Sequence, residues 1–160
     1  MQRGSVLFLR AVVVLIAVGA AALMLWEPHV EGVNAHATNF EIYFKDPFLA
    51  YAYVASIPFF VGLYQGFRVL GYVGQDAVLS TAVVRRLRTI KLCAIVMIGF
   101  VVGAVLFIRL NSKGDDPAGG VFIGMLIAFA ATVIATTMFV LERTLQNAVD
   151  MGRGQRPEPG

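Results

Sequence analysis

The chain has 160 residues, of which 58 % are hydrophobic and 14 % are charged, and its formal net charge is +3. Soluble domains contain about 45–50 % apolar and about 25 % charged residues. A soluble core of this length cannot enclose so much apolar surface, so the composition excludes an ordinary soluble domain and favours a membrane protein. The single cysteine, Cys93, excludes an internal disulfide bond and any multi-cysteine metal site.

Four apolar segments are long enough to cross a bilayer as helices, since a hydrocarbon layer of about 30 Å takes about 20 mainly apolar residues. The predicted helices cover about residues 6–26, 48–72, 90–108 and 119–141. Each run is continuously apolar rather than alternating, which favours helices over the strands of a membrane barrel. We therefore predict an all-α, polytopic membrane protein whose four transmembrane helices form one domain over residues 1–150.

The two ends of the chain allow further expectations. An alternative interpretation makes residues 6–26 a cleaved signal peptide, with Ala35-His36-Ala37 as the cleavage motif. That motif lies well beyond the end of the apolar run, which favours a retained helix. At the other end, residues 151–160 lack apolar periodicity, and we predict a disordered cytoplasmic tail there.

The distribution of Lys and Arg predicts the orientation, because cytoplasmic flanks and loops are enriched in these residues. Three residues belong to the two loops on one side: Lys45, Arg109 and Lys113. The other ten belong to the N-terminal flank, the connection between the second and third helices, and the tail: Arg3, Arg10, Arg68, Arg85, Arg86, Arg88, Lys91, Arg143, Arg153 and Arg156. We therefore expect both termini in the cytoplasm.

Residues 80–91 are predicted to form a short amphipathic helix at the cytoplasmic membrane surface, before the third transmembrane helix. Apolar residues at helical spacing define one face: Leu79, Val83, Leu87 and Ile90. Ser80 is a suitable N-cap. The basic residues of the segment are Arg85, Arg86, Arg88 and Lys91. Two interpretations stay open: these charges enforce topology alone, or they also bind an anionic lipid headgroup or a cytoplasmic protein.

Three predicted helices contain the spacing Gly-x-x-x-Gly, which lets helix backbones approach closely. The six glycines are Gly62, Gly66, Gly99, Gly103, Gly120 and Gly124. Packing within the four-helix bundle is the main interpretation, and the face of a homo-oligomer is the second. In the fourth helix the row of small residues continues to Thr132 and Thr136, so a substrate path along these threonines is a third interpretation.

Few other polar residues are candidates for a catalytic, transport or metal-binding role. We predict that Gln65 makes an interhelical hydrogen bond. No predicted helix has a carboxylate in its middle, and this absence argues against a proton-coupled transporter. The first outer loop holds imidazoles and carboxylates of the kind that bind zinc: Glu27, His29, Glu31, His36 and Glu41. Because their spacing matches no helical ligand motif, a solvated acidic loop is the main interpretation and a metal site the second.

Three stretches carry a family pattern. The first is Ser56-Ile57-Pro58-Phe59-Phe60 through Tyr64-Gln65-Gly66-Phe67-Arg68, and the second is Leu79-Ser80 through Val84, with Leu87 and Ile90-Lys91-Leu92-Cys93-Ala94-Ile95. The third is Asp115-Asp116-Pro117-Ala118-Gly119, with Leu145-Gln146-Asn147-Ala148-Val149-Asp150. Together they resemble the domain-of-unknown-function 2975 family. The resemblance implies a four-helix protein of a bacterial cytoplasmic membrane, sometimes beside a small helix-turn-helix regulator, and no known activity.

Three functional hypotheses follow. The first is a small non-enzymatic membrane protein that acts through lipid or protein contacts, as an accessory or regulatory partner. The second is a small oligomeric transporter or channel, and the third is a metal-dependent membrane enzyme. We expect no catalytic residue, no cofactor and no nucleic-acid partner. If Gln65, Thr132 and Thr136 surrounded a shared cavity, transport would be favoured, whereas a dry core would favour the contact role.

Overall fold

The structure is a computed structural model that describes residues 3–26, 47–111 and 118–154. This part of the chain forms four helices: α1 (Arg3–Trp26), α3 (Pro47–Val73), α4 (Thr81–Asn111) and α5 (Ala118–Gly154). All four are long and apolar enough to cross a membrane, and no strand occurs within the described ranges. The predicted all-α, four-span membrane protein is confirmed.

The third transmembrane helix begins earlier than expected. α4 starts at Thr81 and continues without a break to Asn111, so the predicted interfacial helix over residues 80–91 is not a separate element that turns at the membrane surface. It forms the first turns of α4, because no Pro or Gly stands between Thr81 and Ile98 to break or bend the helix. The Ser80 cap is confirmed: its Oγ accepts a hydrogen bond from the Val83 N–H at 3.4 Å.

The fourth transmembrane helix ends later than expected, since α5 continues past residue 141 to Gly154. Residues 151–154, which we expected in a disordered tail, are therefore helical, and residues 155–160 lie outside the described part of the chain. Half-buried residues at helical spacing explain the extension: Leu145, Ala148 and Val149. This face keeps α5 packed on the bundle beyond its apolar run.

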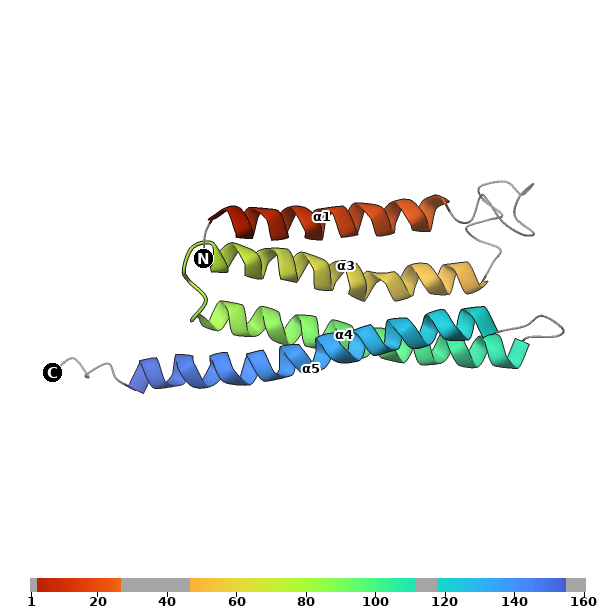
Figure 1. The fold of residues 1–160 in the computed structure, drawn as a ribbon. Helices are drawn as coiled ribbons and strands as arrows, with labels where there is room; N and C mark the ends of the chain where they lie inside the picture. The colour runs from red at the N-terminus through yellow and green to blue at the C-terminus, as the bar shows by residue number, and fades with distance from the viewer. Residues whose placement is uncertain (1–2, 27–46, 112–117, 155–160) are drawn as a thin grey trace.

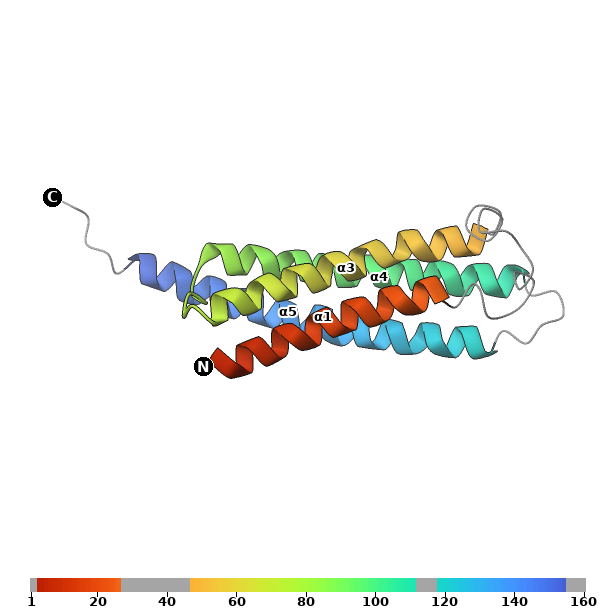
Figure 2. The same ribbon diagram turned by 90° about the horizontal axis from the view of Figure 1, so that it is seen from above.

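The helices run antiparallel to their chain neighbours (Figure 1), and they pack in chain order: α1 on α3, α3 on α4, and α4 on α5. α4 and α5 form the most extensive interface, and α1 is the least tightly packed helix. Both ribbon views place the start of α1 and the end of α5 at the same end of the bundle (Figures 1 and 2). We call this the basic end, for the side chains described below.

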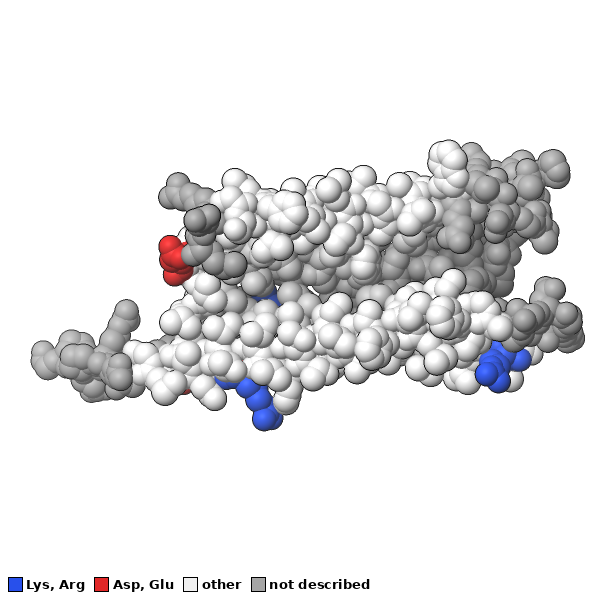
Figure 3. All heavy atoms as spheres, in the orientation of Figure 1, with Lys and Arg blue, Asp and Glu red and all other residues white. Residues whose placement is uncertain are grey.

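The bundle is incompletely closed between α1 and α5, where Figure 3 shows a hollow along the face of the molecule. A cavity of about 410 Å³ lies among the four helices, and apolar side chains line it, including Val13, Pro58, Cys93 and Ile134. Pro58 stands in the middle of α3, where its ring removes one backbone hydrogen bond and bends the helix.

Side chains buried by protein concentrate at the basic end. The buried apolar residues are Val6, Val83, Val84, Leu87, Ala94 and Ala131. Within the part of the chain that the structure describes, only the last two lie in the middle of the bundle, and Val83 has the largest fully buried side chain, at 1 % exposure. The middle of each helix instead exposes large apolar side chains, as expected where lipid surrounds the protein.

One of the predicted glycine pairs, Gly120 and Gly124, lies against a neighbouring helix within the chain at both positions. A Cβ added at Gly120 would lie 3.3 Å from Ile108, and one at Gly124 would lie 3.0 Å from Val105. Because Gly120 and Gly124 carry no side chain, α5 can approach α4 closely at these two positions. Gly62 is more loosely placed, 3.8 Å from the Cβ of Cys93 by the same measure, and its pair mate Gly66 has nothing within 4 Å.

The third pair is asymmetric. A Cβ at Gly103 would lie 2.5 Å from the Tyr51 hydroxyl, which donates a hydrogen bond of 2.6 Å to the Phe100 carbonyl. At Gly99 nothing lies within 4 Å. Gly103 thus makes room for a bond between α3 and α4, whereas Gly99 is open, and a role of either in a homo-oligomer stays a prediction.

Candidate functional site

Basic side chains from α1, α3 and α4 gather at one level of the bundle, near the basic end. We call them the cation layer: Arg10, Arg68, Arg86, Arg88 and Lys91. At about 1.5 Å per residue, α4 rises about 32 Å between Arg88 and Arg109, which matches a hydrocarbon thickness of about 30 Å. We therefore expect the cation layer at one membrane boundary and Arg109 at the other, with further turns of α4 and α5 beyond the layer.

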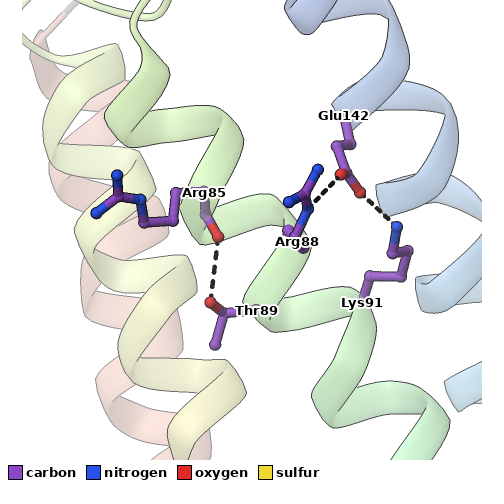
Figure 4. A network of polar contacts seen from close by, with 5 residues as sticks. All are labelled: Arg85, Arg88, Thr89, Lys91 and Glu142. Carbon is purple, nitrogen blue, oxygen red and sulfur yellow. Dashed lines mark hydrogen bonds and ion pairs between the residues drawn. The ribbon is translucent and has the colours of Figure 1, made fainter.

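Glu142 of α5 pairs with two cations of the layer. Arg88 Nε donates to Oε1 at 2.8 Å, and Lys91 Nζ donates to Oε2 at 2.5 Å (Figure 4). Arg88 and Lys91 are three residues apart and so share one side of α4. Glu142 is only 7 % exposed, and two charge-assisted hydrogen bonds offset the cost of burying its carboxylate. The network holds α4 to α5 at the membrane boundary.

An aromatic ring extends this network. The Lys91 Nζ lies 5.3 Å from the centroid of the Phe139 ring, and the Arg143 Cζ lies 4.4 Å from the same centroid. Lys91 therefore has a cation–π contact in addition to its bond with Glu142, whereas Arg143 has the cation–π contact in place of a carboxylate among the described residues. Phe139 and Glu142 are one turn apart on α5 and together form the surface that receives Lys91.

Sequence reasoning missed Glu142. It ended the fourth helix at residue 141, directly before this carboxylate, whereas α5 runs on to Gly154 and so carries Glu142 beyond the predicted span rather than in its middle. The sequence did contain a signal for this pairing. Arg88 and Lys91 are three residues apart near the start of one helix, and Glu142 directly follows the apolar run of the next. Because consecutive helices are antiparallel, the end of α5 lies at the same membrane surface as the start of α4.

Arg86 serves a different interface. Its Nη1 donates a hydrogen bond of 2.6 Å to Gln65 Oε1 on α3, and its Cζ lies 5.7 Å from the Tyr72 ring centroid. The predicted interhelical hydrogen bond of Gln65 is confirmed. The Arg86 Nε is buried and has no hydrogen-bond partner. Arg86 thus links α4 to α3 in the way that Arg88 and Lys91 link α4 to α5.

The side chain of Arg10 crosses from α1 to α3. Its Cζ lies 4.6 Å from the centroid of the Phe67 ring, and its guanidinium lies where a side chain at position 71 would otherwise stand. Gly71 is therefore required for this contact. The Arg10 Nε is buried without a hydrogen-bond partner.

Arg68 lies beside Arg10 and is exposed. Its Nη1 donates a hydrogen bond of 3.3 Å to the Tyr64 hydroxyl, one turn back along α3. A groove of about 370 Å³ between α1 and α3 is lined by Arg10, Phe67, Arg68, Gly71, Tyr72 and Gln75. In the described part of the chain, no carboxylate forms an ion pair with either arginine of this groove.

Arg85 lies on the side of α4 away from Glu142 (Figure 4). Its side chain is exposed, and its backbone carbonyl accepts a hydrogen bond of 3.1 Å from Thr89. Of the four residues predicted to contact lipid or a partner, Arg86, Arg88 and Lys91 therefore also join helices within the chain. Arg85 is the member most available for an external contact, which stays a prediction.

The residues of the transport hypothesis do not converge. Thr132 Oγ1 donates to the Ala128 carbonyl at 2.8 Å and Thr136 Oγ1 to the Thr132 carbonyl at 2.9 Å, and both side chains are exposed on α5. Gln65 is held by Arg86 at the basic end. None of these three is among the described residues that line the apolar cavity.

The residues of the metal hypothesis lie in the segment 27–46, outside the described residues. Across residues 3–26, 47–111 and 118–154, no group of three His, Cys, Asp or Glu side chains is placed to hold a metal ion.

Four antiparallel helices of bilayer length, bounded by a basic layer on one side and Arg109 on the other, define a polytopic α-helical membrane protein. The sequence model of the family described as "Protein of unknown function (DUF2975)" matches residues 32–155, and the chain belongs to this family. It is 35 % identical over 152 residues to "Uncharacterized membrane protein YoaS" of Bacillus subtilis (strain 168), which covers 94 % of this chain and 95 % of that protein. No solved structure matches the chain significantly.

Proposed function

We propose that this protein is a non-enzymatic component of a bacterial cytoplasmic membrane that acts through contacts, as an accessory or regulatory partner of a cytoplasmic protein. The observation that carries the proposal is the separation of Gln65 from Thr132 and Thr136. The threonine hydroxyls are satisfied by their own helix, Gln65 is satisfied by Arg86, and the central cavity is apolar. A dry interior of this kind supports a contact role over a polar transport path.

The surface for such contacts is the part of α4 and α5 that lies at and beyond the cation layer, which we call the platform (residues 81–87 and 143–152). Val83 and Leu87 are buried within it, so it is a packed, ordered helix pair. Arg85 is exposed beside it, and Leu79 and Met151 are each 67 % exposed at its edges. Apolar side chains flanked by a cation suit a partner with acidic groups around an apolar patch.

The proposed orientation places the platform in the cytoplasm. Seven basic residues with described side chains belong to the basic end: Arg10, Arg68, Arg85, Arg86, Arg88, Lys91 and Arg143. Arg109 lies at the opposite end of α4. The positive-inside rule supports a cytoplasmic basic end on this asymmetry.

Thiol labelling tests the orientation. In a Cys93→Ala background, we expect Leu110→Cys to react with a membrane-impermeant reagent in intact cells, and Ala82→Cys to react only after permeabilisation. Both positions are exposed, so burial does not prevent labelling. Reaction of Ala82→Cys from outside would place the platform on the wrong side of the membrane for a cytoplasmic partner.

Photo-crosslinking in cells tests the contact role. We expect a photoreactive residue at Ala82 or Asn147 on the platform to give one discrete protein product, and the same residue at the lipid-facing Val102 to give none. All three positions are exposed. Adding Arg85→Gln should reduce the platform product, because it removes the exposed cation. A product of equal strength at Val102, or none at either platform position, would contradict the proposal.

A further inference from the structure

We propose that the groove between α1 and α3 at the basic end binds the phosphate of an anionic phospholipid. Two guanidinium groups, of Arg10 and Arg68, line this groove of about 370 Å³, together with the polar side chains of Tyr72 and Gln75. None of these four residues belongs to the platform, so the lipid site stands independently of the proposed partner contact.

The charges of the layer are unevenly compensated. Glu142 binds both Arg88 and Lys91, whereas no described carboxylate pairs with Arg10 or Arg68. Arg10 also lies inside a stretch of α1 apolar enough to span the membrane, where an arginine is costly unless it is partnered. At the boundary of the hydrocarbon layer, the anion that surrounds a protein is the lipid phosphate, so an anionic headgroup supplies the partner that the described residues do not provide on this side.

The guanidinium of Arg10 is held in place before any ligand binds. It lies over the Phe67 ring and against Gly71, and these contacts fix its plane. A planar guanidinium presents paired N–H donors that match the oxygens of a phosphate. Because Arg10 is already ordered, little side-chain entropy is lost when the phosphate binds.

An apolar stripe leads from the groove toward the middle of the bilayer, which favours a lipid over a soluble phosphate ester. Tyr64, Val61 and Ile57 precede Arg68 at spacings that keep them on its side of α3. All three are exposed. The stripe gives an acyl chain a continuous apolar surface on the side of α3 that carries Arg68.

Binding of single lipids, measured by native mass spectrometry of the purified full-length protein titrated with phosphatidylglycerol or phosphatidylcholine, tests the proposal. We expect the unmodified protein to prefer phosphatidylglycerol and Arg68→Gln to weaken that binding about fivefold. The variant should fold normally, since Arg68 is exposed and donates only to Tyr64. The matched control is Arg109→Gln, which removes one charge at the other membrane surface and should leave binding unchanged. Equal weakening by both variants would reduce the site to general electrostatic attraction and overturn the proposal.

A glycine substitution separates geometry from charge. Gly71→Ala displaces the Arg10 guanidinium without changing the net charge, and we expect it to weaken phosphatidylglycerol binding at least as much as Arg68→Gln. Gly66→Ala is its control, because nothing lies within 4 Å of that position. Unaltered binding by Gly71→Ala would show that the groove is not the site. In a parallel titration, glycerol phosphate that bound as tightly as the lipid would make the groove a site for soluble phosphate esters and overturn the lipid assignment.

Discussion

At the basic end, α4 meets its neighbours through buried Val83 and Leu87 and through the carboxylate of Glu142, which binds two cations. Toward the opposite end of the bundle, the same helix meets α5 at Gly120 and Gly124, and along the membrane-spanning part most large apolar side chains are exposed. One helix pair thus uses two kinds of interface along its length.

The difference follows from the solvent. Past the cation layer, apolar surface that is not buried faces water, and its burial contributes about 25 cal/mol per Å². Between the two membrane boundaries, lipid contacts an apolar side chain as favourably as protein does, so close backbone approach and hydrogen bonds provide the stabilisation. Substitutions at equivalent residue types should therefore cost more at the basic end than in the middle.

The largest expected effect is that of Glu142→Gln. It leaves Arg88 and Lys91 without their carboxylate at the membrane boundary. Removing one of the two charged partners of a buried ion pair destabilises a protein by about 3–5 kcal/mol. Because the side chain of Arg88 is 64 % exposed and can be hydrated, we expect a loss of about 2–3 kcal/mol here, measured as the free energy of unfolding in mixed micelles.

Asp150→Asn is the matched control for Glu142→Gln. Asp150 is an exposed carboxylate on the same helix whose hydrogen bonds come from Gln146, at 3.2 and 3.3 Å. We expect it to change the unfolding free energy by less than about 0.5 kcal/mol. If the two variants cost the same, the ion network does not hold α4 to α5.

The next largest effect should come from Val83→Ala. Val83 is fully buried where burial is driven by water, and the loss of two methyl groups should cost about 2 kcal/mol. Val102→Ala removes the same groups from the same helix, at an exposed position in the middle of the bundle, and should cost less than about 0.5 kcal/mol. Equal costs would show that the two regions do not differ in the way described.

A smaller effect is expected at the contact between Tyr51 and Gly103. Gly103→Ala displaces the Tyr51 hydroxyl from the Phe100 carbonyl, and we expect a cost of about 1 kcal/mol. In a Tyr51→Phe background the hydroxyl is absent, so the same substitution should cost little. Unfolding measurements on the four proteins of this double-mutant cycle give the coupling.

Gly99→Ala provides the contrast to Gly103→Ala, because an added Cβ meets nothing within 4 Å. Alanine is the better helix former by up to about 1 kcal/mol, so this substitution should be neutral or stabilising. Destabilisation at Gly99 would mean that a second copy of the chain covers this face of α4.

The smallest effect is expected for Thr132→Val combined with Thr136→Val. Both hydroxyls bond to carbonyls of their own helix and face outward, so their loss should change the unfolding free energy by less than about 0.5 kcal/mol. It should also leave any cellular phenotype of the protein intact. A loss of function with normal stability would return the transport path to consideration.

Apolar runs were enough to predict the four spans, because about 20 mainly apolar residues in a row have few alternatives to a membrane helix. The same criterion misplaced the ends of α4 and α5. A helix does not stop where it leaves the hydrocarbon layer, and nothing in residues 81–98 or 141–151 interrupts the backbone. Composition marks the membrane boundary, whereas the ends of the helices depend on backbone signals such as the Ser80 cap.

The candidate site was partly predictable. The bond between Gln65 and another helix followed from the cost of an unpaired amide in a membrane, and Arg88 and Lys91 were singled out without their partner. The contact of Arg10 with Phe67 and Gly71 depends on how α1 and α3 are aligned along their axes. That alignment is set by packing over the whole interface, so no local pattern reveals it.

The unbroken path of α4 through the membrane boundary has a mechanical consequence. A long helix adjusts to a thinner or thicker bilayer by changing its tilt. α4 is continuous between its lipid-facing middle and its first turns. A change in the tilt of the helix therefore also moves Arg85 and the buried Val83. The thickness of the surrounding bilayer thereby becomes a variable that sets the position of the platform relative to the membrane surface.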